Sequence, residues 1–155
     1  MLCRLYTPQD FAGLYAIEEA CFEPPFRFGR GYMRQLVNSS NAATWIAEDE
    51  GRMAGFAIVE WMPETGDAIA YIQTIEVAPA YRGRGIGAGL LRSIESSARD
   101  AGAQAIRLHV DAENAAAIRV YLANGYRCAG REEDYYPLGR AALVYGHTLP
   151  SGAAS

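Results

Sequence analysis

The stretch of residues with the clearest chemistry is rich in glycine and arginine and spans positions 82–87. Arg82 and Arg84 can each pair with two phosphate oxygens at once, and the glycines among them let a ligand approach the backbone because they have no Cβ. The stretch includes a predicted helix start, where free N–H groups and the helix dipole attract anions. These residues therefore predict a site for a pyrophosphate or a similar diphosphate.

Two common phosphate-binding motifs do not account for this stretch. It reads R-G-R-G-I-G, which lacks the lysine and hydroxyl residue that end a P-loop. It also lacks the G-x-G-x-x-G spacing and the acidic ribose ligand of a dinucleotide-binding fold. On these residues alone, the alternative to a diphosphate site is a glycine-rich turn that only connects a strand to a helix.

The elements on either side position this turn. A strand is expected over residues 68–77, ended by Pro79, which has no N–H to donate to a sheet. A helix is expected to begin near Gly85, because apolar residues then recur at helical spacing, and to end at Gly102, a typical C-terminal cap. The diphosphate site is thus predicted where the central strand leads into the long helix.

The rest of the chain predicts an α/β fold with a mixed sheet, in the order β-α-α-β-β-β-α-β-α-β-β. Hairpins early and late give antiparallel pairs, and a strand–helix–strand crossover in the middle gives a parallel pair. A single domain is expected over residues 1–149, and a flexible tail over residues 150–155. The expected strands cover residues 3–6, 44–48, 53–61, 68–77, 105–110, 126–132 and 141–149. Four helices are expected: one begins at Thr7–Pro8, one covers 31–37, one begins near Gly85 and one covers 114–124. Residues 133–140 are expected to be a loop.

Composition and charge exclude several classes of protein. The chain of 155 residues is large enough for one core, and its net charge of −4 argues against nucleic acid as a partner. Cys3, Cys21 and Cys128 have neither zinc nor disulfide spacing, so we expect no metal site and a cytoplasmic location. No apolar run is long enough to span a bilayer, and no membrane partner is expected.

Three segments together resemble the GNAT superfamily of N-acetyltransferases. Residues 82–87 match its [Q/R]-x-x-G-x-[G/A] motif, and Leu108 to Tyr126 is similar to its L-x-V-x-x-x-N-x-x-A-I-x-x-Y-x-x-x-G-[FY] segment. Asp134-Tyr-Tyr-Pro137 resembles the tyrosine loop of enzymes that acetylate protein N-termini, including the ribosomal-protein-alanine type. The resemblance covers nearly the whole chain and implies acetyl transfer from acetyl-CoA to a primary amine, with a protein or peptide N-terminal α-amine as the implied acceptor.

The resemblance also implies how coenzyme A is held. The two central parallel strands are expected to splay apart with the pantetheine arm between them, and a backbone N–H near Val77 is expected to stabilise the oxyanion. Asn114 is implied to contact the cofactor, and it is also a good helix N-cap; one side chain can fill both roles. The implied cofactor-binding residues are Ile75, Val77, Arg82, Gly83, Arg84, Gly85, Ile86, Gly87, Asn114 and Tyr121.

For the chemistry, the resemblance implies an acid and a base. Tyr121 matches the helix tyrosine that protonates the leaving thiolate; a core tyrosine is the alternative. His109 stands where ribosomal-protein-alanine enzymes carry Glu, but some eukaryotic N-terminal acetyltransferases carry His there and Tyr at the position of Tyr71. That pair is implied to deprotonate the amine through an ordered water, and a hydrogen-bonded strand histidine is the alternative. Glu76 is a minor candidate, because strand alternation places it on the opposite face from Tyr71.

Two aromatic loops are expected to select the substrate. Phe26 and Phe28 lie in a proline-containing loop, and Tyr135 and Tyr136 lie in the tyrosine loop. Both loops could hold peptide backbone, although Phe26 and Phe28 could equally cap the core. Two other functions remain open: acetylation of a small amine such as a polyamine, an amino acid or an aminoglycoside, and binding of acyl-CoA by a regulatory domain without turnover. We expect a monomer or a homodimer.

Overall fold

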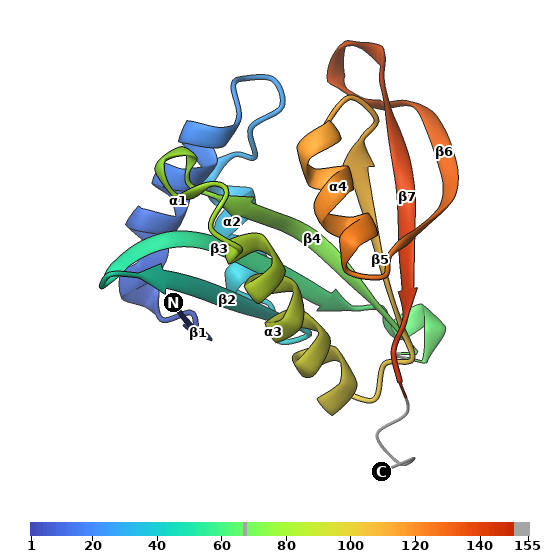
Figure 1. The fold of residues 1–155 in the computed structure, drawn as a ribbon, viewed down its shortest axis with the longest axis horizontal. Helices are drawn as coiled ribbons and strands as arrows, with labels where there is room; N and C mark the ends of the chain where they lie inside the picture. The colour runs from blue at the N-terminus through green and yellow to red at the C-terminus, as the bar shows by residue number, and fades with distance from the viewer. Residues whose placement is uncertain (67, 151–155) are drawn as a thin grey trace.

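The computed structural model describes residues 1–66 and 68–150, so the expected tail lies almost wholly outside the described residues. This part of the chain forms a seven-stranded mixed sheet in the order β1-β2-β3-β4-β5-β7-β6 (Figure 1), which confirms the expected fold class. Short 3-10 turns, each beginning at a proline, link several elements. The strands are β1 (Leu2–Leu5), β2 (Ala42–Asp49), β3 (Arg52–Trp61), β4 (Ile69–Val77), β5 (Ala105–Asp111), β6 (Arg127–Tyr136) and β7 (Arg140–Thr148), and the helices are α1 (Phe11–Cys21), α2 (Arg30–Asn38), α3 (Ile86–Asp100) and α4 (Ala115–Ala123).

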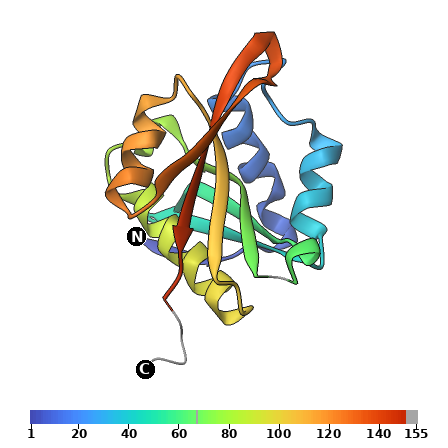
Figure 2. The same ribbon diagram turned by 90° about the vertical axis from the view of Figure 1, so that its right-hand side faces the viewer.

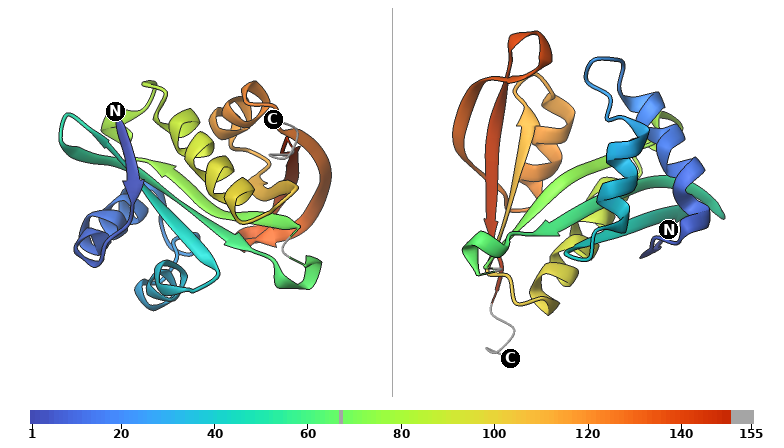
Figure 3. Two further views of the ribbon diagram at one scale, coloured as in Figure 1. Left: turned by 90° about the horizontal axis from the view of Figure 1, so that it is seen from below. Right: turned by 180° about the vertical axis from the view of Figure 1, so that it is seen from behind.

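Two apolar cores lie on opposite faces of the sheet. On one face, α1 and α2 pack Leu14 and Met33 against side chains of β2 and β3. On the other face, α3 and α4 cover the middle strands, and the apolar stripe of α3 around Leu90 is fully buried. Figure 3 shows the two helix pairs on either side of the sheet. Among the described residues, no helix combines the length and the apolar character needed to cross a bilayer.

The central strands β4 and β5 begin as a parallel pair and then separate. Pairing runs from Ile69 opposite Ala105 to Ile72 opposite Leu108. Beyond that point β4 continues along β3 and β5 continues along β7. The expected splay of the central strands is confirmed, and it opens toward the end of the molecule that carries the α1–α2 and β6–β7 loops (Figure 2).

A bulge in β4 changes which side chains share a face. Ile72 pairs with Val59 and Thr74 with Ile58, so Gln73 has no partner on β3. An extra residue reverses the alternation beyond it, and Ile72 and Ile75 accordingly both pack toward α3. Glu76 therefore lies on the same face as Tyr71, toward α1 and α2. The expectation that Glu76 and Tyr71 lie on opposite faces was wrong, because simple alternation does not allow for the bulge.

The last hairpin extends further than expected. β6 reaches Tyr136, so the first part of the expected 133–140 loop is strand, and a turn at Pro137–Gly139 leads into β7. Nearly every residue of β6 is exposed, because it is an edge strand, and its pairing shifts between Glu132 and Tyr136. The polar sequence gave no apolar alternation from which to predict this end of the strand.

Candidate active site

A cavity of about 860 Å³ lies between the end of β4, the 81–87 loop, the start of α3 and one side of α4. This is the position predicted for the diphosphate and the pantetheine arm. The lining is more apolar than polar, which is typical of small-molecule sites. Of the residues predicted for the cofactor, Ile75, Val77, Arg82, Gly83, Gly85, Ile86, Gly87, Asn114 and Tyr121 line the cavity.

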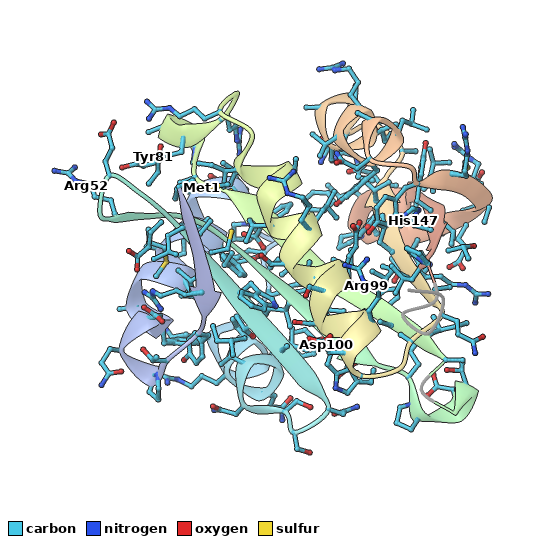
Figure 4. The ribbon with its side chains drawn as sticks, turned by 60° about the horizontal axis from the view of Figure 1, so that its bottom comes forward. Met1, Arg52, Tyr81, Arg99, Asp100 and His147 are labelled. Carbon is cyan, nitrogen blue, oxygen red and sulfur yellow. The ribbon has the colours of Figure 1, made fainter. Side chains whose placement is uncertain are left out.

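The loop before α3 has a backbone conformation that requires glycine. Gly83 and Gly85 have φ values of +77° and +79°, in the left-handed region that other residues rarely adopt. Gly85 caps α3, and the first intrahelical bond of the helix is the one that Gly89 N–H donates to Gly85. The N–H groups of residues 86–88 consequently remain available for an anion. Figure 4 shows Tyr81 beside this end of α3, with Arg99 and Asp100 at the other end.

The two arginines of the loop differ in direction. Arg82 lines the cavity, and its Nε lies 3.3 Å from the Val77 carbonyl oxygen. Arg84 instead pairs with Asp49 at 3.3 Å, and its guanidinium lies 5.2 Å from the ring centre of Tyr81. The side chain of Arg84 is thus directed away from the cavity, although it was predicted to contact the cofactor.

Tyr121 occupies the position expected of an acid on α4. Its side chain is 5% exposed and lines the cavity. Burial raises the pKa of Tyr121 well above its ordinary value, and nearby Tyr136 adds to the shift, so the phenol stays protonated over the physiological range. In the part of the chain that the structure describes, its hydroxyl has no hydrogen-bond partner. Its side chain belongs to the core and also lines the cavity, so the core position does not prevent contact with a ligand there.

Tyr71 and His109 meet where the central strands separate. The Tyr71 hydroxyl lies 2.7 Å from Nδ1 of His109. Burial, followed by the neighbouring Tyr135 side chain, raises the pKa of Tyr71 far above its ordinary value. The phenol therefore remains protonated, which makes His109 rather than Tyr71 the candidate base.

Two residues of β6 complete the surroundings of His109. The Tyr135 ring stacks on the imidazole, with centroids 4.2 Å apart and planes inclined by 1°. Glu132 Oε1 lies 3.2 Å from Nε2, on the side opposite Tyr71, although it is not aligned for a hydrogen bond. Sequence reasoning did not find Glu132. Its closeness to His109 depends on β7 lying between β5 and β6, which no local pattern reveals.

The two aromatic loops approach each other. The Arg140 guanidinium, from the β6–β7 hairpin, lies 5.2 Å from the ring centre of Phe26, in the α1–α2 loop. Tyr136 packs edge-on against Tyr135, with centroids 4.9 Å apart. Phe28 packs on Tyr32 and on the core beneath α1 and α2. Its ring therefore caps the core, which was the alternative to substrate binding. Both loops rise at the same end of the molecule (Figures 1 and 2).

The sequence and the fold match a known family of enzymes. Residues 11–126 match the model of the acetyltransferase (GNAT) family, and this chain belongs to that family. The expected family is thereby confirmed. Acetyl-CoA is the acetyl donor of this family.

Several curated proteins are similar in sequence. The chain is 34% identical over 113 residues to the N-alpha-acetyltransferase RimI of Mycobacterium tuberculosis, covering 73% of this chain and 66% of that protein. It is 30% identical over 112 residues to the mycothiol acetyltransferase of Corynebacterium efficiens, covering 68% of this chain and 37% of that protein. An uncharacterized Mycobacterium leprae protein, ML0378, is 35% identical over 132 residues, covering 84% of this chain and 36% of that protein. The chain thus spans little more than a third of the length of some relatives.

Solved structures share the fold. The ribosomal-protein-S18-alanine N-acetyltransferase of Escherichia coli superposes with a TM-score of 0.84 at 23% identity, covering 97% of this chain and 95% of that one. Arabidopsis thaliana NAA60 in complex with acetyl-CoA superposes with a TM-score of 0.80 at 22% identity, covering 96% and 98%. The mixed sheet and its helices are therefore those of GNAT acetyltransferases.

Proposed function

We propose that this protein transfers an acetyl group from acetyl-CoA to the N-terminal α-amine of a protein or peptide. The observation that carries the proposal is the Tyr71–His109 pair at the strand opening, with the Tyr135 ring stacked on the imidazole. The similarity to RimI of Mycobacterium tuberculosis supports the same choice of acceptor. We further propose a single acetyltransferase domain over residues 1–149 that acts in the cytoplasm as a monomer or a homodimer, with no nucleic-acid or membrane partner.

The groups that line the cavity suit coenzyme A in their chemistry. We expect the N–H groups at the start of α3 and the Arg82 guanidinium to hold the diphosphate, and the glycine at position 85 to let it approach the backbone. Ile75 and Val77 have no β5 partner beyond the point where the strands separate, so their free backbone groups are suited to pair with an extended arm. The bound donor supplies a thioester whose carbonyl is open to attack.

Deprotonation of the amine is assigned to His109. The substrate arrives mostly as ammonium and must lose a proton before it can attack. A water molecule can carry that proton to the Tyr71 oxygen while the Tyr71 proton passes to Nδ1 of His109, 2.7 Å away. The imidazolium that results faces the Glu132 carboxylate, which favours its positive charge.

Two further groups act on the acetyl-transfer step. We expect a backbone N–H near Val77 to stabilise negative charge on the carbonyl oxygen. The unpartnered hydroxyl of Tyr121 then donates its proton as the thiolate leaves, since a phenol of raised pKa is a donor throughout the working pH range. The Phe26 loop and the Tyr135–Tyr136 loop would hold the peptide on the opposite side.

A direct assay tests this proposal. The purified protein is mixed with acetyl-CoA and either peptides with free N-termini or the same peptides with blocked N-termini but a free lysine. We expect free thiol to be released only with the first set. Turnover of no peptide, in a panel that varies the first two residues, would contradict the N-terminal acceptor.

The second candidate function is acetylation of a small amine. It is favoured by the similarity to two small-molecule enzymes, the Corynebacterium efficiens mycothiol acetyltransferase and, at 38% identity over 98 residues, the Streptomyces lavendulae streptothricin acetyltransferase. Turnover of such amines but of no peptide would establish it. Coenzyme A binding without turnover of either class would indicate the third possibility, a regulatory acyl-CoA-binding domain.

A further inference from the structure

Two buried carboxyl groups meet between α1 and β4, on the sheet face that carries Tyr71. Glu18 is 1% exposed and Glu76 is 4% exposed. Each carboxyl uses one oxygen in a hydrogen bond: Glu18 Oε2 accepts from the Phe28 backbone N–H at 2.9 Å, and Glu76 Oε2 accepts from Thr74 Oγ1 at 2.6 Å. The remaining oxygen of each, Oε1, is buried and has no donor among the described residues.

One proton between the two carboxyls accounts for both unpartnered oxygens. A buried acceptor without a donor is destabilising, and two adjacent carboxylates cannot both ionise without strong repulsion. Burial, and then the neighbouring Glu18 carboxyl, raise the pKa of Glu76 to about 10. The pair thus holds one proton at neutral pH, with one carboxylic acid donating to one carboxylate.

The groups around the pair do not neutralise it. From β3, the apolar ring of Phe56 lies opposite Glu76. On α1, burial and the charge of Glu76 raise the pKa of the Cys21 thiol. The Arg82 guanidinium reaches Cys21 Sγ at 3.5 Å and the Val77 carbonyl oxygen instead of either carboxyl. Tyr15 directs its hydroxyl to the Phe28 carbonyl oxygen.

We propose that Glu18 and Glu76 share a single proton and through it fix the substrate loop, residues 22–29, against the end of β4. The chain of contacts is continuous: Thr74 holds Glu76, Glu76 meets Glu18, and Glu18 holds the Phe28 backbone N–H. The Phe28 carbonyl oxygen is held in turn by Tyr15 at 2.8 Å. Both carboxyls are positioning residues in this scheme.

The shared proton has a consequence for substrate binding, which rests on the proposed function. β4 ends at Val77, where the oxyanion donor is expected, and Glu76 borders the same cavity. The carboxyl pair therefore sets the distance between the substrate loop, which is proposed to bind the peptide, and the end of β4, where the thioester is expected to bind. Loss of the proton places two negative charges side by side and releases Phe28, so the loop should loosen in alkaline solution.

An exchange measurement tests the shared proton without relying on activity. Amide hydrogen exchange at Phe28 is followed by NMR from about pH 6 to above pH 10, and expressed as protection relative to the unfolded chain. We expect wild-type protection to fall at the alkaline end. Glu76→Gln should abolish that fall, because an amide donates to Glu18 but does not titrate. Glu76→Leu should remove most of the protection at every pH, since it leaves Glu18 without its donor.

Matched variants make the result decisive. Glu19→Gln changes the exposed neighbour of Glu18 on α1 and should behave as wild type. An alkaline fall in Glu76→Gln equal to that of wild type would overturn the shared proton. So would full Phe28 protection in Glu76→Leu. Because Glu76→Gln preserves size and hydrogen bonding, the test stands even if Glu76→Leu does not fold.

A kinetic measurement tests the role in positioning. Glu18→Leu removes the acceptor for the Phe28 N–H and should raise the KM for a peptide about tenfold, with coenzyme A affinity within about twofold of wild type. An unchanged KM, or an equal loss of coenzyme A affinity, would overturn the positioning role. If wild type acetylates no peptide, the proposed acceptor fails, whereas the exchange result at Phe28 still decides the shared proton.

Discussion

The Tyr71 hydroxyl lies 2.7 Å from Nδ1 of His109, at the place where β4 and β5 stop pairing. The two residues are on different strands, and each strand alone would give either of them an ordinary place on a sheet. Because the strands diverge just beyond Ile72 and Leu108, the pair borders the opening in which the acetyl group is expected. This relationship makes deprotonation of the substrate the most direct step to test.

Removal of the imidazole should slow the reaction. In His109→Ala we expect kcat to fall about a hundredfold, because the side chain that takes the amine proton is gone. Tyr71→Phe removes the hydroxyl through which that proton reaches Nδ1 and should lower kcat by a similar factor. Steady-state rates of the wild type and the two variants make the comparison. An unchanged kcat in His109→Ala would place the base elsewhere.

Glu132 should tune the base without being one. Glu132→Gln keeps the side-chain shape but removes the charge opposite Nε2 of His109. A carboxylate beside the imidazole stabilises the positive charge that forms when the ring accepts a proton, so kcat should fall a few-fold without it. Glu133→Gln is the control, because Glu133 pairs with Arg131 on the exposed edge. Equal kcat values for the two variants would contradict a role for Glu132.

The proposed acid, the Tyr121 hydroxyl, can be removed by a substitution that deletes a single oxygen atom. Tyr121→Phe should lower kcat ten- to a hundredfold and leave coenzyme A affinity near that of wild type. The matched control is Tyr145→Phe, whose buried ring lies 6.3 Å from that of Tyr121 but does not line the cavity. Single-turnover rates and calorimetry with coenzyme A separate chemistry from binding. An unchanged rate in Tyr121→Phe would refute its role as acid.

The loop glycine offers a test of the diphosphate site. Gly85→Ala places a Cβ at a φ of +79°, which costs about 1 to 2 kcal/mol for a left-handed residue. If the loop relaxes to avoid this strain, the N–H groups at the start of α3 lose their alignment, and we expect coenzyme A affinity to fall about tenfold or more. Gly51→Ala, at a φ of +75° in the β2–β3 hairpin, introduces the same strain away from the cavity. Equal affinities for the two variants would argue against the diphosphate site.

Stability should depend on pH through Glu76. Its pKa is raised to about 10 in the folded chain from an ordinary value of 4.5. A carboxyl with a raised pKa binds more protons when folded, so its contribution to stability is complete below about pH 4.5 and is lost as the pH rises toward 10. We expect the Tm of wild type to fall relative to that of Glu76→Gln over this range. A Tm difference that is constant with pH would contradict the shift.

The sequence by itself determined the order of elements, the family and nine of the residues that line the cavity. Apolar spacing along α3, the proline that ends β4 and the glycines at positions 83 and 85 act within a few residues of each other, so they can be read from the chain. Tyr121 and Asn114 were placed by a motif of fixed length on one helix. Local signals of this kind can be recognised in the sequence without knowledge of the fold.

Only the tertiary structure decided how side chains from different strands meet. The bulge at Gln73 moved Glu76 to the face of Tyr71, and the sheet order β5-β7-β6 brought Glu132 and Tyr135 to His109. Arg84, although part of the motif, turned to Asp49 on the β2–β3 hairpin. Contacts like these depend on register and strand order, which arise from packing between distant segments and leave no periodic trace in the chain.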